Sequence, residues 1–151
     1  MSITTKGEFW IGSEPADVKA FLEAYTSEGY PIHEFRLCRC ACGSEIFKIE
    51  ASVGDAVARR TCSRCGRVHF MLDSGELWDN TEAEPELLEC VECGSTEANV
   101  GVGFSLYQEG EVSGEIHWVY IGHRCAACGL LGSFADWKVA RVGAHDLFDR
   151  V

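Results

Sequence analysis

The segment Cys62-Ser63-Arg64-Cys65-Gly66 sets the pattern of this chain, because it returns as Cys90-Val91-Glu92-Cys93-Gly94 and as Cys125-Ala126-Ala127-Cys128-Gly129. Two thiolates on either side of a tight turn can bind one metal ion, and the glycine takes a backbone angle that a Cβ would hinder. Backbone amides of such a turn also donate to the sulfurs. Each segment therefore predicts one half of a metal site.

A fourth group, Cys38-Arg39-Cys40-Ala41-Cys42-Gly43, departs from this pattern because Arg39 occupies the position that would complete it. The partner of Cys42 is then either Cys40, with one intervening residue, or Cys38, with three. We favour Cys40. We expect Cys38 to be a buried apolar thiol close to the site.

Two successive pairs of groups complete two four-cysteine sites. Cys42 and Cys62 enclose 19 residues, and Cys93 and Cys125 enclose 31, which a longer hairpin can fill. The alternative is a cross-brace, in which the first group pairs with the third and the second with the fourth. The internal repeat favours successive pairing, and the predicted ligands are Cys40, Cys42, Cys62, Cys65, Cys90, Cys93, Cys125 and Cys128.

This ligand set predicts two zinc ions as cofactors, with thiolates in all four positions of each site. A site without an open position is structural, because neither water nor substrate can reach the metal. The odd number of nine cysteines excludes full disulfide pairing. The sequence begins without a signal peptide and has no run of about 18 apolar residues. We therefore expect a cytoplasmic protein with reduced thiols and no membrane partner.

Alternating apolar residues predict strands between and after the cysteine groups. A repeat of cysteine turn, hairpin, cysteine turn and closing strand follows, with a polar, acidic linker between its two copies. The strands are expected at residues 47–51, 57–61, 68–72, 100–106, 116–121 and 132–139. The expected domains are an N-terminal helical segment (1–31), two modules (32–79 and 87–142), the linker (80–86) and a C-terminal tail (143–151).

The N-terminal segment has the pattern of an amphipathic helix. Ser13 can cap its first turn, and Gly29 and Pro31 end it. An apolar stripe is expected on one face at positions i, i+3, i+4 and i+7, formed by Val18, Phe21, Leu22 and Tyr25. We expect the helix to pack on the first module; the alternative is a helix that binds a partner.

The cysteine turns resemble those of zinc ribbons, here in tandem. The resemblance covers about residues 36–73 and 87–139 and leaves the N-terminal helix unmatched. It implies a mainly β fold with one N-terminal helix and two small antiparallel zinc-ribbon modules. Zinc ribbons occur in transcription factors, ribosomal proteins, nucleotide-handling enzymes and protein-docking modules, so the resemblance leaves the function open. Rubredoxins share similar turns and bind iron, which makes an iron electron carrier an alternative.

The distribution of charge separates the two halves. The formal charge of −11 argues against a protein that mainly coats nucleic acid. Residues 1–79 have nine Lys and Arg against twelve Asp and Glu, whereas residues 80–151 have four against twelve. Residues 36–67 run against this trend, with seven basic side chains and three acidic ones. These arginines either offset the anionic thiolates or contact a partner.

The sequence contains no catalytic fingerprint and no nucleophile–base pair once the cysteines are assigned to metal. We therefore expect a non-enzymatic protein that docks another protein as an adaptor or inhibitor. The alternative is a nucleic-acid-associated factor that makes local phosphate contacts through the basic stretch, including Arg59, Arg60 and Arg64. The sequence does not indicate an oligomeric state.

Overall fold

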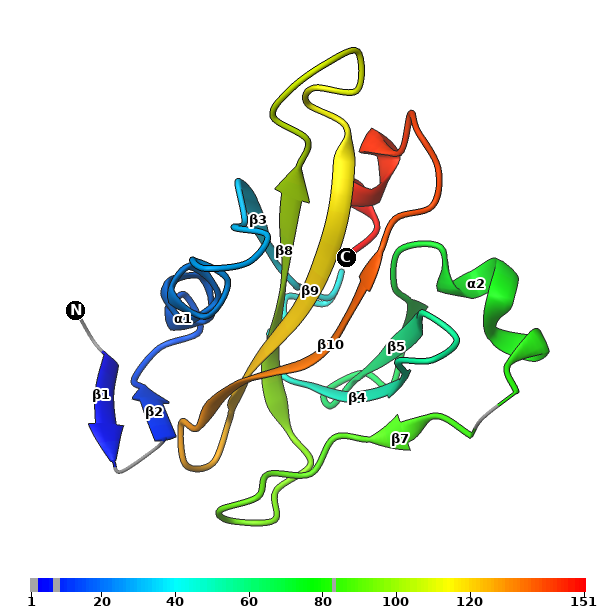
Figure 1. Cartoon of the computed structure of the whole chain (residues 1–151). Coiled ribbons are helices and arrows are strands. Elements are labelled where there is room, and N and C mark those ends of the chain that lie inside the picture. The colour runs from blue at the N-terminus through cyan, green and yellow to red at the C-terminus, as the bar shows by residue number, and fades with distance from the viewer. Residues whose placement is uncertain (1–2, 7–8, 83) are drawn as a thin grey trace.

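A computed structural model describes residues 3–6, 9–82 and 84–151 of the chain (Figure 1). In this part of the chain, a small antiparallel pair lies beside an eight-stranded sheet of order β10-β9-β8-β4-β5-β6, with β3 added to β8 and β7 added to β4. The strands are β1 (Ile3–Lys6), β2 (Phe9–Gly12), β3 (Glu34–Leu37), β4 (Phe47–Ser52), β5 (Val57–Cys62), β6 (Val68–Phe70), β7 (Glu86–Leu87), β8 (Ala98–Leu106), β9 (Ile116–Cys125) and β10 (Leu131–Lys138).

Two α-helices and two 3-10 helices complete the described chain: α1 (Asp17–Tyr25), α2 (Ser74–Leu77), η1 (Trp78–Asn80) and η2 (His145–Asp149). The mainly β, antiparallel architecture expected from the sequence is confirmed. All six predicted strands are present, with ends that differ by one or two residues except in β9, which continues four residues beyond its predicted end. Neither of the described α-helices has the length and apolarity needed to cross a lipid bilayer.

The strands that lead into the cysteine groups are exchanged between the two halves. Strand β3 enters the first group but pairs with β8 of the second half, where Leu37 lies opposite Gly101. Strand β7 enters the third group but pairs with β4 of the first half, where Leu87 lies opposite Glu50. The starts of β4 and β8 also pair with each other. The expected side-by-side modules are therefore joined in one sheet, and their boundaries as domains stay a prediction.

The exchanged strands and the turns that follow them match between the two halves at an offset of 50 to 51 positions, which grows to 63 at the second cysteine turns, where Cys62 matches Cys125. Phe47 and Ala98, which pair directly, are 51 positions apart, as are Cys42 and Cys93. Before the turns the offset is 50, because the first cysteine turn is one residue shorter; Leu37 thus matches Leu87. The sequence repeat is consequently an internal pseudosymmetry of the sheet.

Helix α1 packs on the second half, which corrects the expectation that it would pack on the first module. It contacts β8, β9 and β10 (Figure 1), and Val18 and Leu22 are fully buried there. Glycine at position 122 makes this approach feasible, because a Cβ there would lie 2.9 Å from the side chains of both residues. Packing at such short range selects the glycine-rich face of the second half.

The cap of α1 also differs from the expectation. Ala16 occupies the N-cap position and no side chain caps the first turn. The Oδ2 of Asp17, the first helical residue, instead accepts the backbone N–H of Ser13 at 2.9 Å and of Glu14 at 3.2 Å in the segment before the helix. Ser13 was expected to be the acceptor. A carboxylate in the first turn also suits the positive end of the helix dipole.

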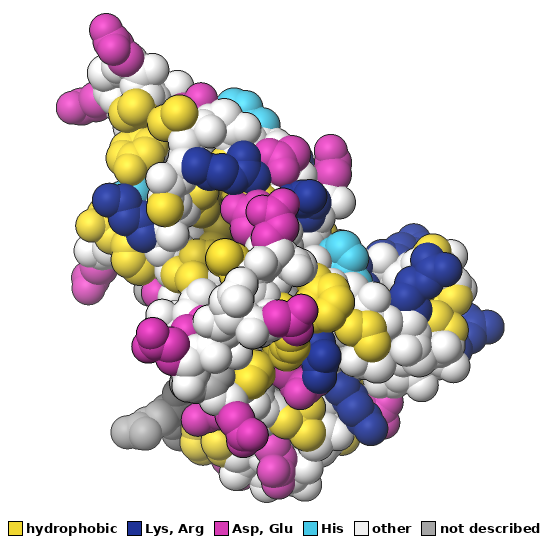
Figure 2. Space-filling view, turned by 90° about the vertical axis from the view of Figure 1, so that its right-hand side faces the viewer, with side chains coloured by type: hydrophobic (Ala, Val, Ile, Leu, Met, Phe, Trp, Pro, Cys, Tyr) yellow, Lys and Arg dark blue, Asp and Glu magenta, His cyan; other side chains and the backbone are white. Residues whose placement is uncertain are grey.

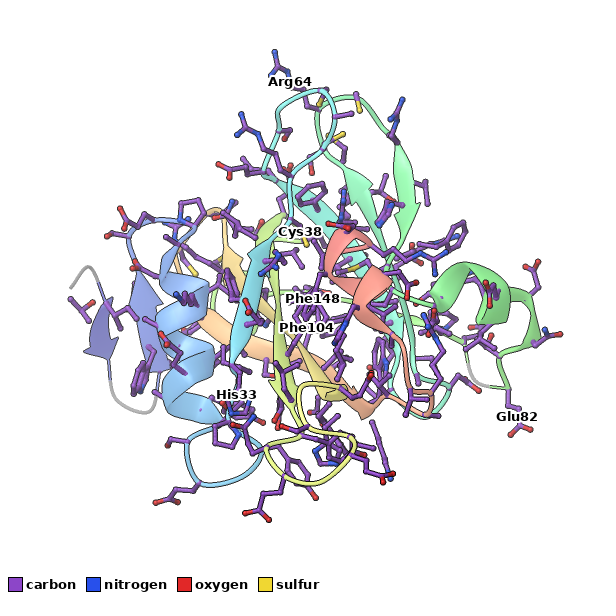
Figure 3. All side chains as sticks on the ribbon, turned by 90° about the horizontal axis from the view of Figure 1, so that it is seen from above. His33, Cys38, Arg64, Glu82, Phe104 and Phe148 are labelled. Carbon is purple, nitrogen blue, oxygen red and sulfur yellow. The ribbon has the colours of Figure 1, made fainter. Side chains whose placement is uncertain are left out.

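The C-terminal residues, expected to form a tail, fold onto the core. Leu147 is buried, and the ring of Phe148 lies edge-on to Phe104, with centroids 4.8 Å apart (Figure 3). Arg60 donates from Nε and Nη2 to the Val151 backbone oxygen at 3.0 and 2.8 Å. Segment 145–151 therefore covers the apolar layer between the two halves.

Candidate metal centres

The first cysteine cluster forms where the turn after β3 meets the end of β5. The Sγ atoms of Cys40 and Cys65 are 3.5 Å apart, and those of Cys42 and Cys62 are 3.6 Å apart. All four Sγ atoms lie within 4.8 Å of one another. This group of four thiols can hold a metal ion.

The second cluster repeats this arrangement after β7 and at the end of β9. The Sγ atoms of Cys90 and Cys128 are 3.5 Å apart, as are those of Cys93 and Cys125, and again all four lie within 4.8 Å. The structure thus groups neighbouring cysteine turns and not the alternate turns of a cross-brace. All nine cysteines of the chain lie among the described residues and are free of disulfides.

The four turns share a hydrogen bond from the glycine back to the first cysteine, although the first turn is one residue shorter than the others. In each turn the glycine N–H donates to the carbonyl of the first cysteine at 2.8–2.9 Å, and the glycine has a positive φ. In the first turn this bond joins Gly43 to Cys40. The backbone therefore places Cys40, and not Cys38, in the position that Cys62, Cys90 and Cys125 occupy in the other turns.

Backbone amides of the turns favour thiolates at equivalent positions in the two clusters. The N–H groups of Cys65 and Arg64 each lie 3.4 Å from the Sγ of Cys62, and the Cys65 amide contributes most to lowering the pKa of Cys62 to about 6. Burial acts to raise the pKa of Cys125, but the amides of Cys128 and Ala127 and its contacts with neighbouring thiols lower it to about 7. Thiolates are the form in which cysteine binds metal.

The two clusters differ in how they are covered. Ile11 packs on the second cluster together with Leu130. The Gly12 N–H donates to the Gly129 carbonyl at 2.8 Å, and Arg124 Nε donates to the Gly12 carbonyl at 2.7 Å. The N-terminal segment therefore covers the second cluster, a feature that the sequence pattern did not reveal.

The first cluster lies in a projecting part of the molecule that we call the basic lobe, formed by the turns at residues 39–44 and 62–67 and the adjoining part of β4. Figure 2 shows Lys and Arg side chains gathered on the projection at its right, and Figure 3 places Arg64 at its tip. Four exposed cations belong to it. These cations are Arg39, Lys48, Arg64 and Arg67. None of the four has an ion-pair partner among the described residues.

Cys38 lies outside both clusters and is fully buried in the main core. Burial raises the pKa of Cys38 to about 12, although the Arg60 guanidinium acts in the opposite direction. Its backbone N–H bonds to Val100 on β8, just as the N–H of Leu88 bonds to Ile49 on β4. Cys38 is thus the counterpart of Leu88, a neutral apolar residue of the core.

Replacing Cys38 by alanine is expected to lower the free energy of unfolding by about 1 kcal/mol, because one buried sulfur is lost. The metal content is expected to stay at that of the wild-type protein. Denaturant unfolding and metal analysis of the purified C38A variant measure both quantities. A variant that loses metal would show that Cys38 is a ligand.

His123 adjoins the second cluster in sequence but belongs to neither group of four thiols. Its ring packs against Gly132 and faces Phe134 edge-on at 6.4 Å. Burial lowers the pKa of His123 to about 4. The ring is therefore a neutral part of the packing between β9 and β10.

The fold and the two clusters define the class of this chain: a mainly β protein with two four-cysteine groups, each able to hold a metal ion. Comparison with protein-family models, curated proteins and solved structures finds no match for the chain. The function must therefore be argued from its own residues.

Proposed function

We propose that the chain is a non-enzymatic cytoplasmic protein in which two structural zinc ions hold a surface that docks another protein, as an adaptor or inhibitor. Four thiolates are a donor set that zinc prefers for structural sites. A tetrahedral site with Zn–S bonds of about 2.3 Å has sulfurs about 3.8 Å apart. Two Sγ pairs in each cluster are 3.5–3.6 Å apart, close to this value, and all four Sγ atoms of each cluster lie within 4.8 Å of one another.

A structural role follows from the ligand set. With the eight cysteines committed, neither zinc has an open position for water or substrate. The cytoplasm would keep these thiols reduced. The metal would instead fix the cysteine turns and, through them, the strands that lead into them.

The docking role is supported by the composition of the outer face of the sheet in the first half. It combines the unpaired cations of the basic lobe with exposed apolar side chains on neighbouring strands. Val68 and Phe70 on β6 and Leu87 on β7 are 47%, 38% and 47% exposed. Aromatic and aliphatic side chains beside arginine are the composition of protein interfaces.

Capture experiments in the native cell test the docking role. The tagged, metal-loaded chain is expected to recover a protein in near-equal amount, and nuclease treatment is expected to leave the complex intact. The matched control carries substitutions of Val68 and Phe70 by Ser and is expected to recover that protein poorly. Equal recovery by both forms would contradict the proposed surface.

A second candidate is a nucleic-acid-associated factor, which the unpaired cations of the basic lobe favour. Phosphate contacts by these side chains would give binding that weakens steeply with salt. Of the three arginines expected from the sequence, Arg60 is buried and Arg59 is paired with Glu50. Charge reversal at Arg39, Arg64 and Arg67 would therefore be the change that abolishes binding to an RNA or DNA oligonucleotide. No binding at low salt would eliminate this candidate.

A further inference from the structure

Strand β6 ends the order of the main sheet and has one paired edge. His69 lies opposite Arg60 on β5, the Arg67 carbonyl accepts the Cys62 N–H, and the Met71 N–H donates to Ala58. Backbone groups alternate in direction along a strand. The N–H and C=O groups of Val68 and Phe70 therefore point away from β5, and in the described part of the chain they have no partner.

The open stretch of this edge is short and has a defined end. The next outward-pointing amide, that of Leu72, donates to the Arg150 carbonyl at 2.8 Å. His69 Nε2 contacts the same oxygen at 3.0 Å. The C-terminal segment thus closes the edge at Leu72, whereas the other end of the open stretch leads into the basic lobe.

The side chains beside the open edge offer apolar contacts. Phe70 lies opposite Arg59 and Val68 opposite Thr61, so all four share the outer face of the sheet. The rings of Phe70 and Trp78 have centroids 5.6 Å apart, and the Arg59 guanidinium lies 4.5 Å from the Trp78 ring. An added strand would find aromatic and aliphatic surface next to its backbone partner.

The charge at the end of this edge that leads into the basic lobe is positive, whereas Asp73 and Glu76 lie near Phe70 at the other end. Arg59 is already paired with Glu50 at 2.9 Å, and Arg150 is paired with Asp73 at 3.3 Å. Arg64 and Arg67, directly before β6, are exposed and have no ion-pair partner among the described residues. A ligand along β6 would therefore gain from acidic side chains toward the basic lobe.

The same half of the sheet already binds a segment of this character. Strand β7, with the sequence Glu86-Leu87 after Glu84 and Pro85, adds to the free edge of β4. Acidic and apolar residues thus alternate in a short extended segment that pairs with this sheet. The internal precedent favours a peptide over a nucleic acid, as does the formal charge of −11 on the whole chain.

We propose that the open edge of β6 binds an extended peptide segment of a partner protein in which acidic and apolar residues alternate. The segment adds a strand beside Val68 and Phe70, places apolar side chains against Phe70 and Trp78, and places carboxylates near Arg64 and Arg67. This inference rests on the proposed docking function and names the surface and the chemistry of the partner.

The test uses the metal-loaded full chain and a fluorescent synthetic peptide of sequence Asp-Glu-Val-Asp-Ile-Glu-Val-Asp. We expect saturable binding by fluorescence anisotropy at low salt, with NMR shift changes centred on the amides of Val68 and Phe70. In V68P the lost N–H points away from β5, so the variant should keep its metal. Without this donor and the valine side chain, binding should weaken about tenfold. R64E with R67E should weaken binding at least as much, whereas the control K138E, on β10, should not.

Several outcomes would overturn the proposal. The two-metal protein could fail to bind the peptide, bind it with shift changes away from β6, or bind it with the same affinity as V68P. Tighter binding of a single-stranded RNA oligonucleotide at the same amides would also contradict the proposal, as would a dimer of the free chain that protects these amides. If the native partner is still captured by V68P, only this inference fails. If neither the wild-type chain nor any variant captures a protein, the proposed function is contradicted as well.

Discussion

Removing the metal with a strong chelator is expected to unfold the chain, with loss of the β-sheet signal in circular dichroism and of the cooperative thermal transition. A structural zinc ion supplies on the order of 10–16 kcal/mol in zinc-finger peptides, whereas a whole domain is stable by about 5–15 kcal/mol. Cys40 and Cys62 belong to the main apolar cluster, so loss of the ion would open the core itself.

Readdition of zinc to the chelated protein should restore both signals, which separates metal loss from irreversible damage. The C38A variant serves as control, because it should respond to the chelator like the wild-type chain. An unchanged spectrum and melting temperature after complete removal of metal would refute a structural role for the ions.

Breaking one cluster is expected to weaken the other. The C90S variant removes a ligand from the second cluster, at the end of β7, while β3, which leads to Cys40 of the first cluster, depends on β8 for its hydrogen bonds. Unfolding of the second half therefore leaves the first cluster without a fixed entry strand. We expect the metal affinity of the first site to fall by about tenfold or more.

Competition with a calibrated chelator, read by native mass spectrometry, measures this coupling. The mirror variant C40S should weaken the second site in the same way, because β7 depends on β4. If each variant keeps one metal ion at wild-type affinity, the clusters are independent and the exchanged strands do not transmit metal loss.

The sequence predicted the local part of this fold well. Alternation in residues 47–51 predicted β4, which has one face toward the core. The apolar run of residues 116–121 predicted β9, which is buried on both faces and continues to Cys125. The exchange of β3 and β7 was not predicted, since four and two residues carry little periodicity and their partners lie far away in the sequence. Pairing of such short strands is decided by tertiary context.

The surface on which α1 packs could also not be predicted from the sequence. Of the predicted apolar stripe, Tyr25 is exposed and Phe21 is half-buried, whereas Val18 and Leu22 are buried. Which surface buries them is decided by Gly101, Gly103 and Gly122, whose missing side chains make room for the helix only on the second half. No local pattern in the sequence marks these glycines as a surface for a helix.

The cysteine groups were readable because turn geometry and metal ligation impose a fixed local spacing. Cys38 was harder to assign, because three cysteines within five residues offer two spacings. The structure separates them through the Gly43–Cys40 hydrogen bond and the match of Cys38 to Leu88. Ile11 packs on the second cluster although it is far from those cysteines in the chain. No local sequence pattern predicts this contact.

Native mass spectrometry of the purified full chain, combined with elemental analysis, tests the central claim most directly. We predict two zinc ions per chain, a colourless protein, and the loss of eight thiol protons that eight thiolate ligands require. A chain that folds without metal, binds a single ion, or is coloured by iron bound to its cysteines would contradict two structural zinc sites.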